Sequence, residues 1–198
     1  MKLILTHLVL MTSLLAFSQN YEDSVRELRI KHMVHLTDPE NGVLLKEEIE
    51  HFLGLDYFLI DTSYLVTAKF KKDKGKRFKM PTTTERAPLY RRYGYVEFTL
   101  NGQLLKLTVY QNIQLKKQKD YKDYLFLPFR DQTSGNESYG GGRYLDLSKP
   151  ATDTIRIDFN LSYNPYCAYS HRFSCPIPPA ENTLSVPIHA GEKTPKGH

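Results

Sequence analysis

The sequence predicts a mainly β fold, a single antiparallel β-barrel or sandwich with one or two α-helices at the N-terminus. Three observations predict it. The 198 residues include 14 Tyr and 10 Phe, no Trp and only 4 Met, a composition that favours strands over a helical bundle. The hydrophobic period changes from helical to two near residue 57. About seven or eight short alternating segments follow, mostly joined by short connections.

The overall composition is that of an ordinary globular protein. Apolar residues make up 40% and charged residues 25% of the chain, with 11 Gly and 11 Pro. These proportions exclude wholesale disorder, collagen and coiled coil. The net charge of +5 is modest, and no internal repeat or linker divides the chain. A chain of this length is expected to fold as one domain.

Residues 1–18 have the features of a secretory signal peptide. Lys2 provides a positive start, Leu3 to Phe17 is mostly apolar, and Ala16 and Ser18 are the small residues that a signal peptidase reads. We expect cleavage before Gln19. A membrane anchor is the alternative, but the apolar stretch is shorter than the roughly 18–20 residues needed to span, and four polar residues interrupt it. The mature domain, residues 19–198, is therefore expected to be exported, periplasmic or extracellular, with no transmembrane segment.

Two helices are predicted before the strands. Tyr21 to Leu36 shows a broken apolar stripe through Val25, Leu28 and Leu36, with Met33 or His32 between them, and acidic residues in its first turn. A second, shorter helix is predicted from Leu45 to Phe52.

The strongest strand signal is a hairpin. Tyr93 to Leu100 and Gln103 to Gln111 alternate in hydrophobicity and flank Asn101-Gly102, a pair typical of tight hairpin turns. The other predicted strands are Tyr64–Phe70, Tyr124–Leu127, Tyr144–Leu147, Thr154–Phe159 and Leu184–Ala190.

A proline-rich loop near the C-terminus carries the two cysteines of the chain. Residues 160–182 contain four of the prolines, together with Cys167 and Cys175. In an exported protein such a pair predicts one disulfide that staples a short loop. Two alternatives remain: a free structural pair, or a metal or reactive thiol that uses His171 between them. Structural zinc needs four ligands, and no fourth one is near.

Several motifs together resemble a known family. They run from Phe129 to Leu147, Ile157 to Asn160, Tyr163 to Tyr169, Ser174 to Asn182 and Ala190 to Glu192. This motif region, residues 129–192, resembles the DUF1684 family of prokaryotic proteins. The likeness extends over roughly residues 45–193. It implies no established activity, substrate, cofactor or catalytic residue.

A candidate ligand site lies within the same region. Alternation along the strand before it places Asp158 and Asn160 on a polar face, where they are predicted to converge with Tyr139, Arg143 and Asn164. An arginine with a carboxylate and amides can hold a carboxylate, a phosphate or sugar hydroxyls. The alternative is structural: Asp158 pairs with Arg143, and the asparagines cap loop backbone.

Other chemical signatures are weak. Gly140–Gly142 lacks the Lys-Ser/Thr pair of a phosphate loop, which predicts a tight turn. No Gly-x-Ser-x-Gly elbow is present. Two oxygen or nitrogen clusters do not have metal-site spacing, so we expect no metal and no cofactor. These clusters are Asp131, Thr133, Asn136 and Glu137, and His32, His35 and His51.

The basic run from Lys69 to Lys79 includes Phe70 and Phe78 and could suggest nucleic-acid binding. The exported location and the modest net charge argue against that partner, and a solvated hairpin tip or attraction to an anionic surface polymer fits better.

Three function classes follow. The leading one is a non-catalytic exported module that binds a small ligand or an envelope component. The second is an enzyme of hydrolase or transferase type that uses the Arg143/Asp158/Asn160 cluster, with Asp158 as acid or base and Tyr139 or Arg143 stabilising negative charge. The third is a structural or partner-binding protein.

Overall fold

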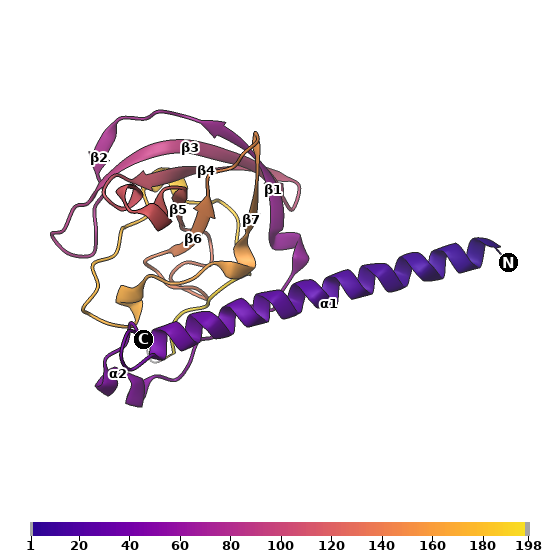
Figure 1. Ribbon diagram of the computed structural model, residues 1–198, viewed down its shortest axis with the longest axis horizontal. Coiled ribbons are helices and arrows are strands. Elements are labelled where there is room, and N and C mark those ends of the chain that lie inside the picture. Colours follow the sequence, from indigo (N-terminus) through magenta and orange to yellow (C-terminus); the bar gives the residue numbers. More distant parts are fainter. Residues whose placement is uncertain (1, 197–198) are drawn as a thin grey trace.

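The computed structural model describes the backbone of residues 2–196 and the side chains of residues 19–196. Two helices, α1 (Lys2–Thr37) and α2 (Lys46–His51), precede the strands (Figure 1). The strands are β1 (Leu65–Lys72), β2 (Arg77–Lys79), β3 (Leu89–Leu100), β4 (Gln103–Asn112), β5 (Tyr124–Phe129), β6 (Arg143–Ser148) and β7 (Thr154–Asp158).

All described strand pairs are antiparallel and form one curled sheet. The strand order is β6-β5-β4-β3-β1-β7, with β2 paired to β3 off this path. The sheet curls into a half-barrel rather than two separate layers (Figure 1). The predicted mainly β antiparallel fold with N-terminal helices is therefore confirmed.

The β3–β4 hairpin is the longest pairing and forms as predicted. Asn101 and Gly102 both have positive φ, 49° and 78°, as a two-residue hairpin turn requires. The register joins Leu100 to Gln103 and Phe98 to Leu105. Because paired residues share a face, the apolar side chains of both arms point into the half-barrel.

The hydrophobic core fills the inner face of the sheet. It combines the hairpin with apolar residues from β1, β5, β7 and the C-terminal segment. Its fully buried members include Ala68, Val96, Leu107, Val109, Leu125, Leu127, Phe129, Ile157, Phe159, Ile188 and Ala190.

The part of α1 from residue 19 onward packs against the sheet. Val25 and Leu36 are buried as predicted, but Leu28 is 46% exposed, so the predicted stripe is only partly covered. Arg29 tethers the helix because its two terminal nitrogens donate to the carbonyls of Phe58 and Asn160, both at 3.1 Å. The side chains of the predicted signal peptide, residues 1–18, lie outside the described residues.

No helix in the described part of the chain combines the length and apolar character that crossing a membrane requires.

The segment from Leu184 to Ala190 is buried in alternation but does not form the predicted strand. Its backbone bonds to a loop instead: Leu184 N donates to Arg130 O at 2.8 Å, and Ile188 N donates to the Asp131 carboxylate at 3.1 Å. The alternation predicted burial correctly, but the segment pairs only briefly with the loop at residues 130–132, and at Ile188 the Asp131 carboxylate takes the place of a backbone acceptor.

The predicted disulfide does not form in this structure, where Cys167 and Cys175 are both free thiols. The Cys175 sulfur accepts a hydrogen bond from the Cys167 backbone N–H at 3.2 Å. Interaction with the Cys175 thiol lowers the pKa of Cys167 to about 7. The surrounding region is ordered by three short 3₁₀ turns rather than by a staple: Phe159–Leu161, Tyr166–Ala168 and Ala180–Asn182.

Candidate functional site

A cavity of about 320 Å³ lies between the two edge strands of the half-barrel, β6 and β7, beneath α1. We call it the seam cleft. Its lining residues are Leu28, Arg29, His32, Tyr57, Leu145, Asp146, Leu147, Arg156, Asp158, Leu161, Ser162, Tyr163 and Glu192.

The seam cleft follows from the topology of the sheet. β6 and β7 end the strand order, so each has one edge without a strand partner. Exposed edges are normally covered, and here α1 and the turn after β7 provide the cover. The backbone of a helix is already hydrogen-bonded within the helix, so it cannot pair with a strand edge. Side chains of α1 therefore cover these edges, and a cleft lined partly by polar groups remains between them.

Asp158 connects β7 to α1 at the cleft. The Tyr21 hydroxyl lies within hydrogen-bonding distance of both carboxylate oxygens, at 3.0 and 2.9 Å. Asn160 donates to the same carboxylate from its backbone N, at 3.0 Å, and from its side chain, at 3.1 Å. Burial and the Asp158 charge raise the pKa of Tyr21, so its hydroxyl stays a donor.

Glu192 is the most buried acid of the cleft. One carboxylate oxygen accepts hydrogen bonds from the Asn164 backbone N and the Tyr169 hydroxyl, both at 2.8 Å. The other accepts from the Tyr57 hydroxyl at 3.3 Å. Burial nevertheless raises the pKa of Glu192 to about 7. Its carboxyl group therefore changes charge near neutral pH.

His32 on α1 faces Glu192 across the cleft. Its Nε2 lies 3.5 Å from a Glu192 carboxylate oxygen but is buried and makes no hydrogen bond. Burial, with a smaller contribution from the nearby His35, lowers the pKa of His32 to about 4. The imidazole is therefore neutral at pH 7, and the contact is not an ion pair.

Arg29 adds a second unpaired nitrogen. Its Nε is buried without a hydrogen-bond partner, and its guanidinium lies 4.3 Å from the centre of the Tyr57 ring. Buried polar groups are normally paired. Two unpaired nitrogens on the helix that covers one cleft therefore indicate a place where a ligand or water completes the bonding.

Arg143 does not join the cleft. It is 0% exposed and pairs with Asp131 at 2.9 Å. Its guanidinium also donates to the carbonyls of Ile188 (2.8 Å), Ala190 and Glu192 (3.1 Å). The predicted convergence of Arg143 with Asp158 is absent, and so is the alternative ion pair between them, because Arg143 instead anchors the C-terminal segment.

The remaining predicted residues lie around the cleft rather than in it. Asn160 is fully buried and also accepts from the Asp61 backbone N at 3.0 Å. Asn164 is fully buried and donates to Tyr169 and to the Lys193 carbonyl. Tyr139 lies near the cysteine pair. Burial raises the pKa of Tyr139, and interaction with Cys167 and Cys175 adds to that increase. Of the five predicted residues, only Asp158 lines the seam cleft.

The residues that sequence reasoning missed are Glu192, His32, Tyr57 and Arg29. Glu192 closes the last motif of the family resemblance and follows Gly191, whose φ of 79° and contact with Ser162 exclude a side chain. That glycine was the available signal. His32 carried none, because an isolated histidine on a helix resembles a surface residue.

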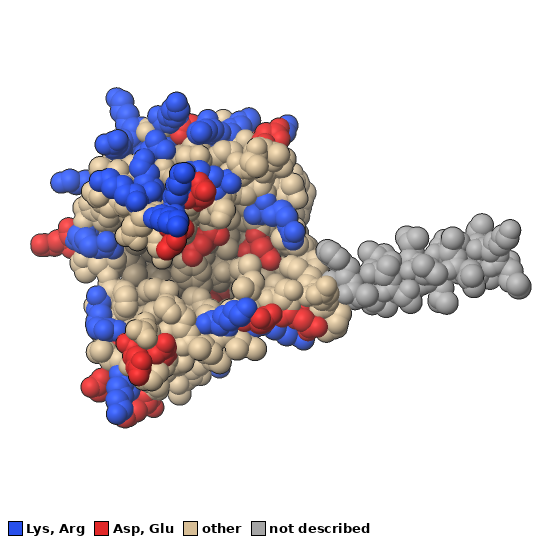
Figure 2. Space-filling view, viewed as in Figure 1, with Lys and Arg blue, Asp and Glu red and all other residues tan. Residues whose placement is uncertain are grey.

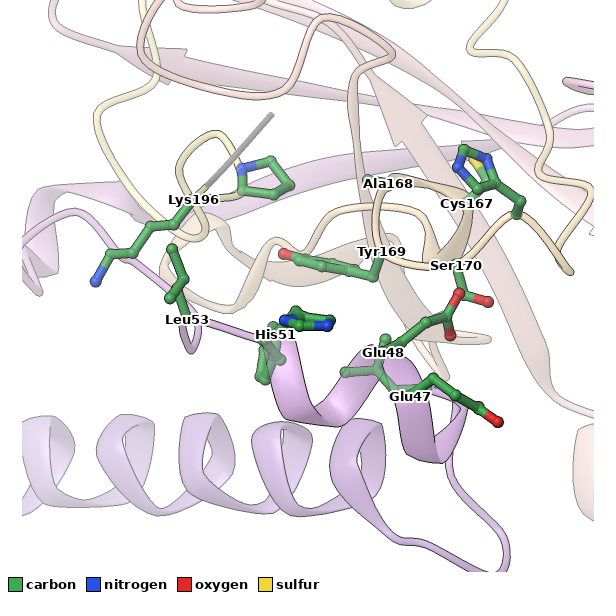
Figure 3. A pocket seen from close by; sticks show the side chains of 13 residues that line it. Glu47, Glu48, His51, Leu53, Cys167, Ala168, Tyr169, Ser170 and Lys196 are labelled. Carbon is green, nitrogen blue, oxygen red and sulfur yellow. The ribbon is translucent and has the colours of Figure 1, made fainter.

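A second cavity, of about 470 Å³, lies between α2 and the turn that carries the cysteines. Figure 3 shows Glu47, Glu48 and His51 on α2, facing the segment with Cys167 and Tyr169. The α2 groups Glu47 and His51 are exposed. Solvent can therefore hydrogen-bond to both groups. The seam cleft, in contrast, is lined by residues with buried nitrogens that have no hydrogen-bond partner.

Within residues 19–196, no group of three or more His, Cys, Asp or Glu side chains could hold a metal ion. Side-chain oxygens of the cluster considered for calcium already bind other protein groups. Asp131 accepts from Arg143 and from Thr133, and Glu137 lies 3.1 Å from His189.

Comparison with known proteins supports the resemblance seen in the sequence. The family described as a protein of unknown function, DUF1684, matches residues 50–193. An uncharacterised protein of Haloarcula marismortui, solved by solution NMR, is 32% identical. The alignment covers 92% of this chain and 99% of that one, with a TM-score of 0.69. No curated protein matches the chain.

Proposed function

The chain belongs to the DUF1684 family, and from that premise we propose that it is a non-catalytic module that binds a small polar ligand in the seam cleft. The observation that carries the proposal is the pair of buried, unpaired nitrogens, His32 Nε2 and Arg29 Nε, on the helix that covers the cleft.

The charges of the cleft indicate what kind of ligand it suits. Three carboxylates line it, against two arginines, and Arg29 already uses its terminal nitrogens on backbone carbonyls. The carboxylates already accept hydrogen bonds from protein groups, but they outnumber the arginines. This excess of negative charge favours a ligand rich in hydroxyl or amino groups. Leucines from α1, β6 and the turn after β7 supply apolar walls.

The size of the cleft limits the ligand. Ligand pockets range from about 300 to 1,000 Å³, and the seam cleft is near the lower end at about 320 Å³. A monosaccharide, a small polyol or an amine of similar size fits this volume. A longer polymer does not.

Ligand-observed NMR tests the proposal with a panel of monosaccharides, polyols and small amines. Leu28 lines the cleft and is 46% exposed, so Leu28→Trp narrows the cleft without disturbing the core. Leu59→Trp is the matched control, because Leu59 is 90% exposed and does not line the cleft. We expect saturation transfer to at least one compound with the natural protein and the control, and none with Leu28→Trp.

Two outcomes overturn this function: no compound binds at millimolar concentration, or binding survives in Leu28→Trp. New product resonances that appear with the natural protein and disappear in Glu192→Gln would favour the enzyme alternative. A pKa near neutrality suits Glu192 for acid or base catalysis.

Export is part of the same proposal and rests on the character of residues 1–18. The intact mass of protein recovered from outside the cytoplasm tests it. A chain that begins at Gln19 supports export, and a chain that keeps residues 1–18 and remains inside the cell contradicts it.

A further inference from the structure

A second surface of the molecule carries basic residues drawn from several segments. Figure 2 shows Lys and Arg gathered over the part of the half-barrel formed by β2 and β3, with only scattered Asp and Glu among them. We define the cationic rim as Lys72, Arg77, Arg91, Lys116 and Lys149. These residues come from β1, β2, β3, the turn after β4 and the connection after β6.

Two arginines of the rim oppose each other directly. Arg77 on β2 and Arg91 on β3 are cross-strand partners. Directly opposed residues in an antiparallel pair share a face, and like charges there destabilise the sheet. No carboxylate within 4.0 Å forms an ion pair with Lys72, Arg77, Arg91 or Lys116 anywhere in residues 19–196. The fold bears this repulsion without an internal counterion.

The guanidinium of Arg91 is held in place by a neutral partner. Its Nε and Nη2 both donate to the Gln111 side-chain oxygen, at 3.2 and 2.7 Å. Gln111 is only 1% exposed, and its side-chain nitrogen is buried without a hydrogen-bond partner. An amide orients the arginine but leaves its charge uncompensated, in contrast to the Asp131 carboxylate at Arg143.

The rim cations converge around one aromatic ring. Lys72, Arg91 and Lys149 lie 5.4, 5.5 and 5.9 Å from the centre of the Tyr93 ring. The positive charge of the rim also acts on Lys116. Its pKa is lowered first by desolvation and then by repulsion from neighbouring cations, which include Arg91, Arg77, Lys149 and Lys117.

We propose that the cationic rim binds an acidic polysaccharide, through a row of sulfate or carboxylate groups spaced along the polymer. Lys149 already pairs with Asp123 at 3.1 Å. A linear polyanion supplies counterions to the other rim cations, and the oriented guanidinium of Arg91 suits planar or tetrahedral anions. The central ring, Tyr93, is 8% exposed and already covered by cations, so it offers no platform on which a nucleic-acid base could stack.

This inference does not depend on the seam cleft. Fluorescence anisotropy with a labelled heparin octasaccharide tests it, at several salt concentrations. In Arg77→Gln/Arg91→Gln we expect at least tenfold weaker binding and a shallower dependence on salt, by about two ionic contacts. Lys46→Gln/Lys196→Gln removes the same charge from exposed positions near α2 and is expected to change the affinity less than twofold.

Arg91→Lys separates orientation from charge, because lysine keeps the charge but cannot make the two bonds to Gln111. We expect about threefold weaker binding from this change. Circular dichroism confirms that each variant is folded.

Equal loss of affinity in the rim and control variants would show attraction by net charge alone and overturn the proposal. Tighter binding of single-stranded oligo-dT of matched charge would also overturn it, in favour of nucleic acid. Stronger displacement of the octasaccharide by sodium sulfate than by sodium chloride at equal ionic strength would overturn the polysaccharide proposal in favour of a site for a small anion.

Discussion

Two polar clusters meet at the same C-terminal segment, yet they differ in how well their groups are paired. In the first, Arg143 and Asp131 bind each other and hold the backbone of Ile188 to Glu192. In the second, the side chain of Glu192 enters the seam cleft, where His32 and Arg29 keep unpaired nitrogens. The Nε of Arg143 is unpaired as well, but its terminal nitrogens all donate to protein groups, and Arg143 does not line the seam cleft. Dense pairing of the terminal nitrogens therefore identifies a structural anchor, whereas unpaired nitrogens beside a cavity identify a ligand site.

The largest expected effect tests the anchor. Arg143→Met leaves Asp131 buried without its cation, and breaking a buried pair in this way costs about 3–5 kcal/mol. Chemical denaturation measures the loss. Arg156→Met is the control, because Arg156 is exposed, and we expect a change below about 0.5 kcal/mol. Equal losses of stability in the two variants would show that Arg143 is no more important for the fold than an exposed arginine.

The second prediction concerns Glu192, whose pKa rises from the ordinary 4.5 to about 7 in the folded protein. Between these values the folded protein holds a proton that the unfolded chain releases. The contribution of Glu192 to stability is therefore full below pH 4.5 and is lost as pH rises through 7, by up to about 3 kcal/mol. Denaturation across this range should show Glu192→Gln lacking that decline. An unchanged pH profile in the variant would contradict the burial argument.

His32 is expected to have the opposite and somewhat smaller effect, because its ring keeps some contact with solvent. Its pKa falls from 6.5 to about 4 on folding, so its contribution is present above pH 6.5 and is lost as pH falls through 4. His32→Gln should remove about 2 kcal/mol of acid sensitivity. NMR titration of the imidazole provides an independent check: a pKa above 6 would show that His32 is charged beside Glu192.

The smallest effect is expected where Asp158 holds α1. Asp158→Ala removes the bonds from Tyr21 and Asn160 and should cost about 1–2 kcal/mol, and Tyr21→Phe about 1 kcal/mol. Hydrogen exchange of α1 from residue 19 onward should increase in both variants, while β3 and β4 stay protected. Uniform loss of protection would show that Asp158 supports the whole fold rather than the helix that covers the cleft.

The sequence by itself determined the local features and the family. The Asn101-Gly102 turn, the two helices and the alternating strands each depend on neighbours in the chain. All of these except the last strand formed, although α1 begins at Lys2 rather than at the predicted Tyr21. Alternation also identified the burial of Leu184 to Ala190, because it reports which face is apolar. It could not predict that the segment would bond to the loop at residues 130–132, partly through the Asp131 carboxylate, rather than to a strand of the sheet.

Only the tertiary structure decided the partners and charge states of the polar residues. Arg143 was predicted to meet Asp158 but binds Asp131, and the unremarkable His32 faces Glu192 from the opposite end of the chain. Such contacts depend on how the sheet curls and where α1 covers its open edges. The pKa values depend on desolvation by the whole surrounding structure, a sum over distant residues that no local pattern encodes.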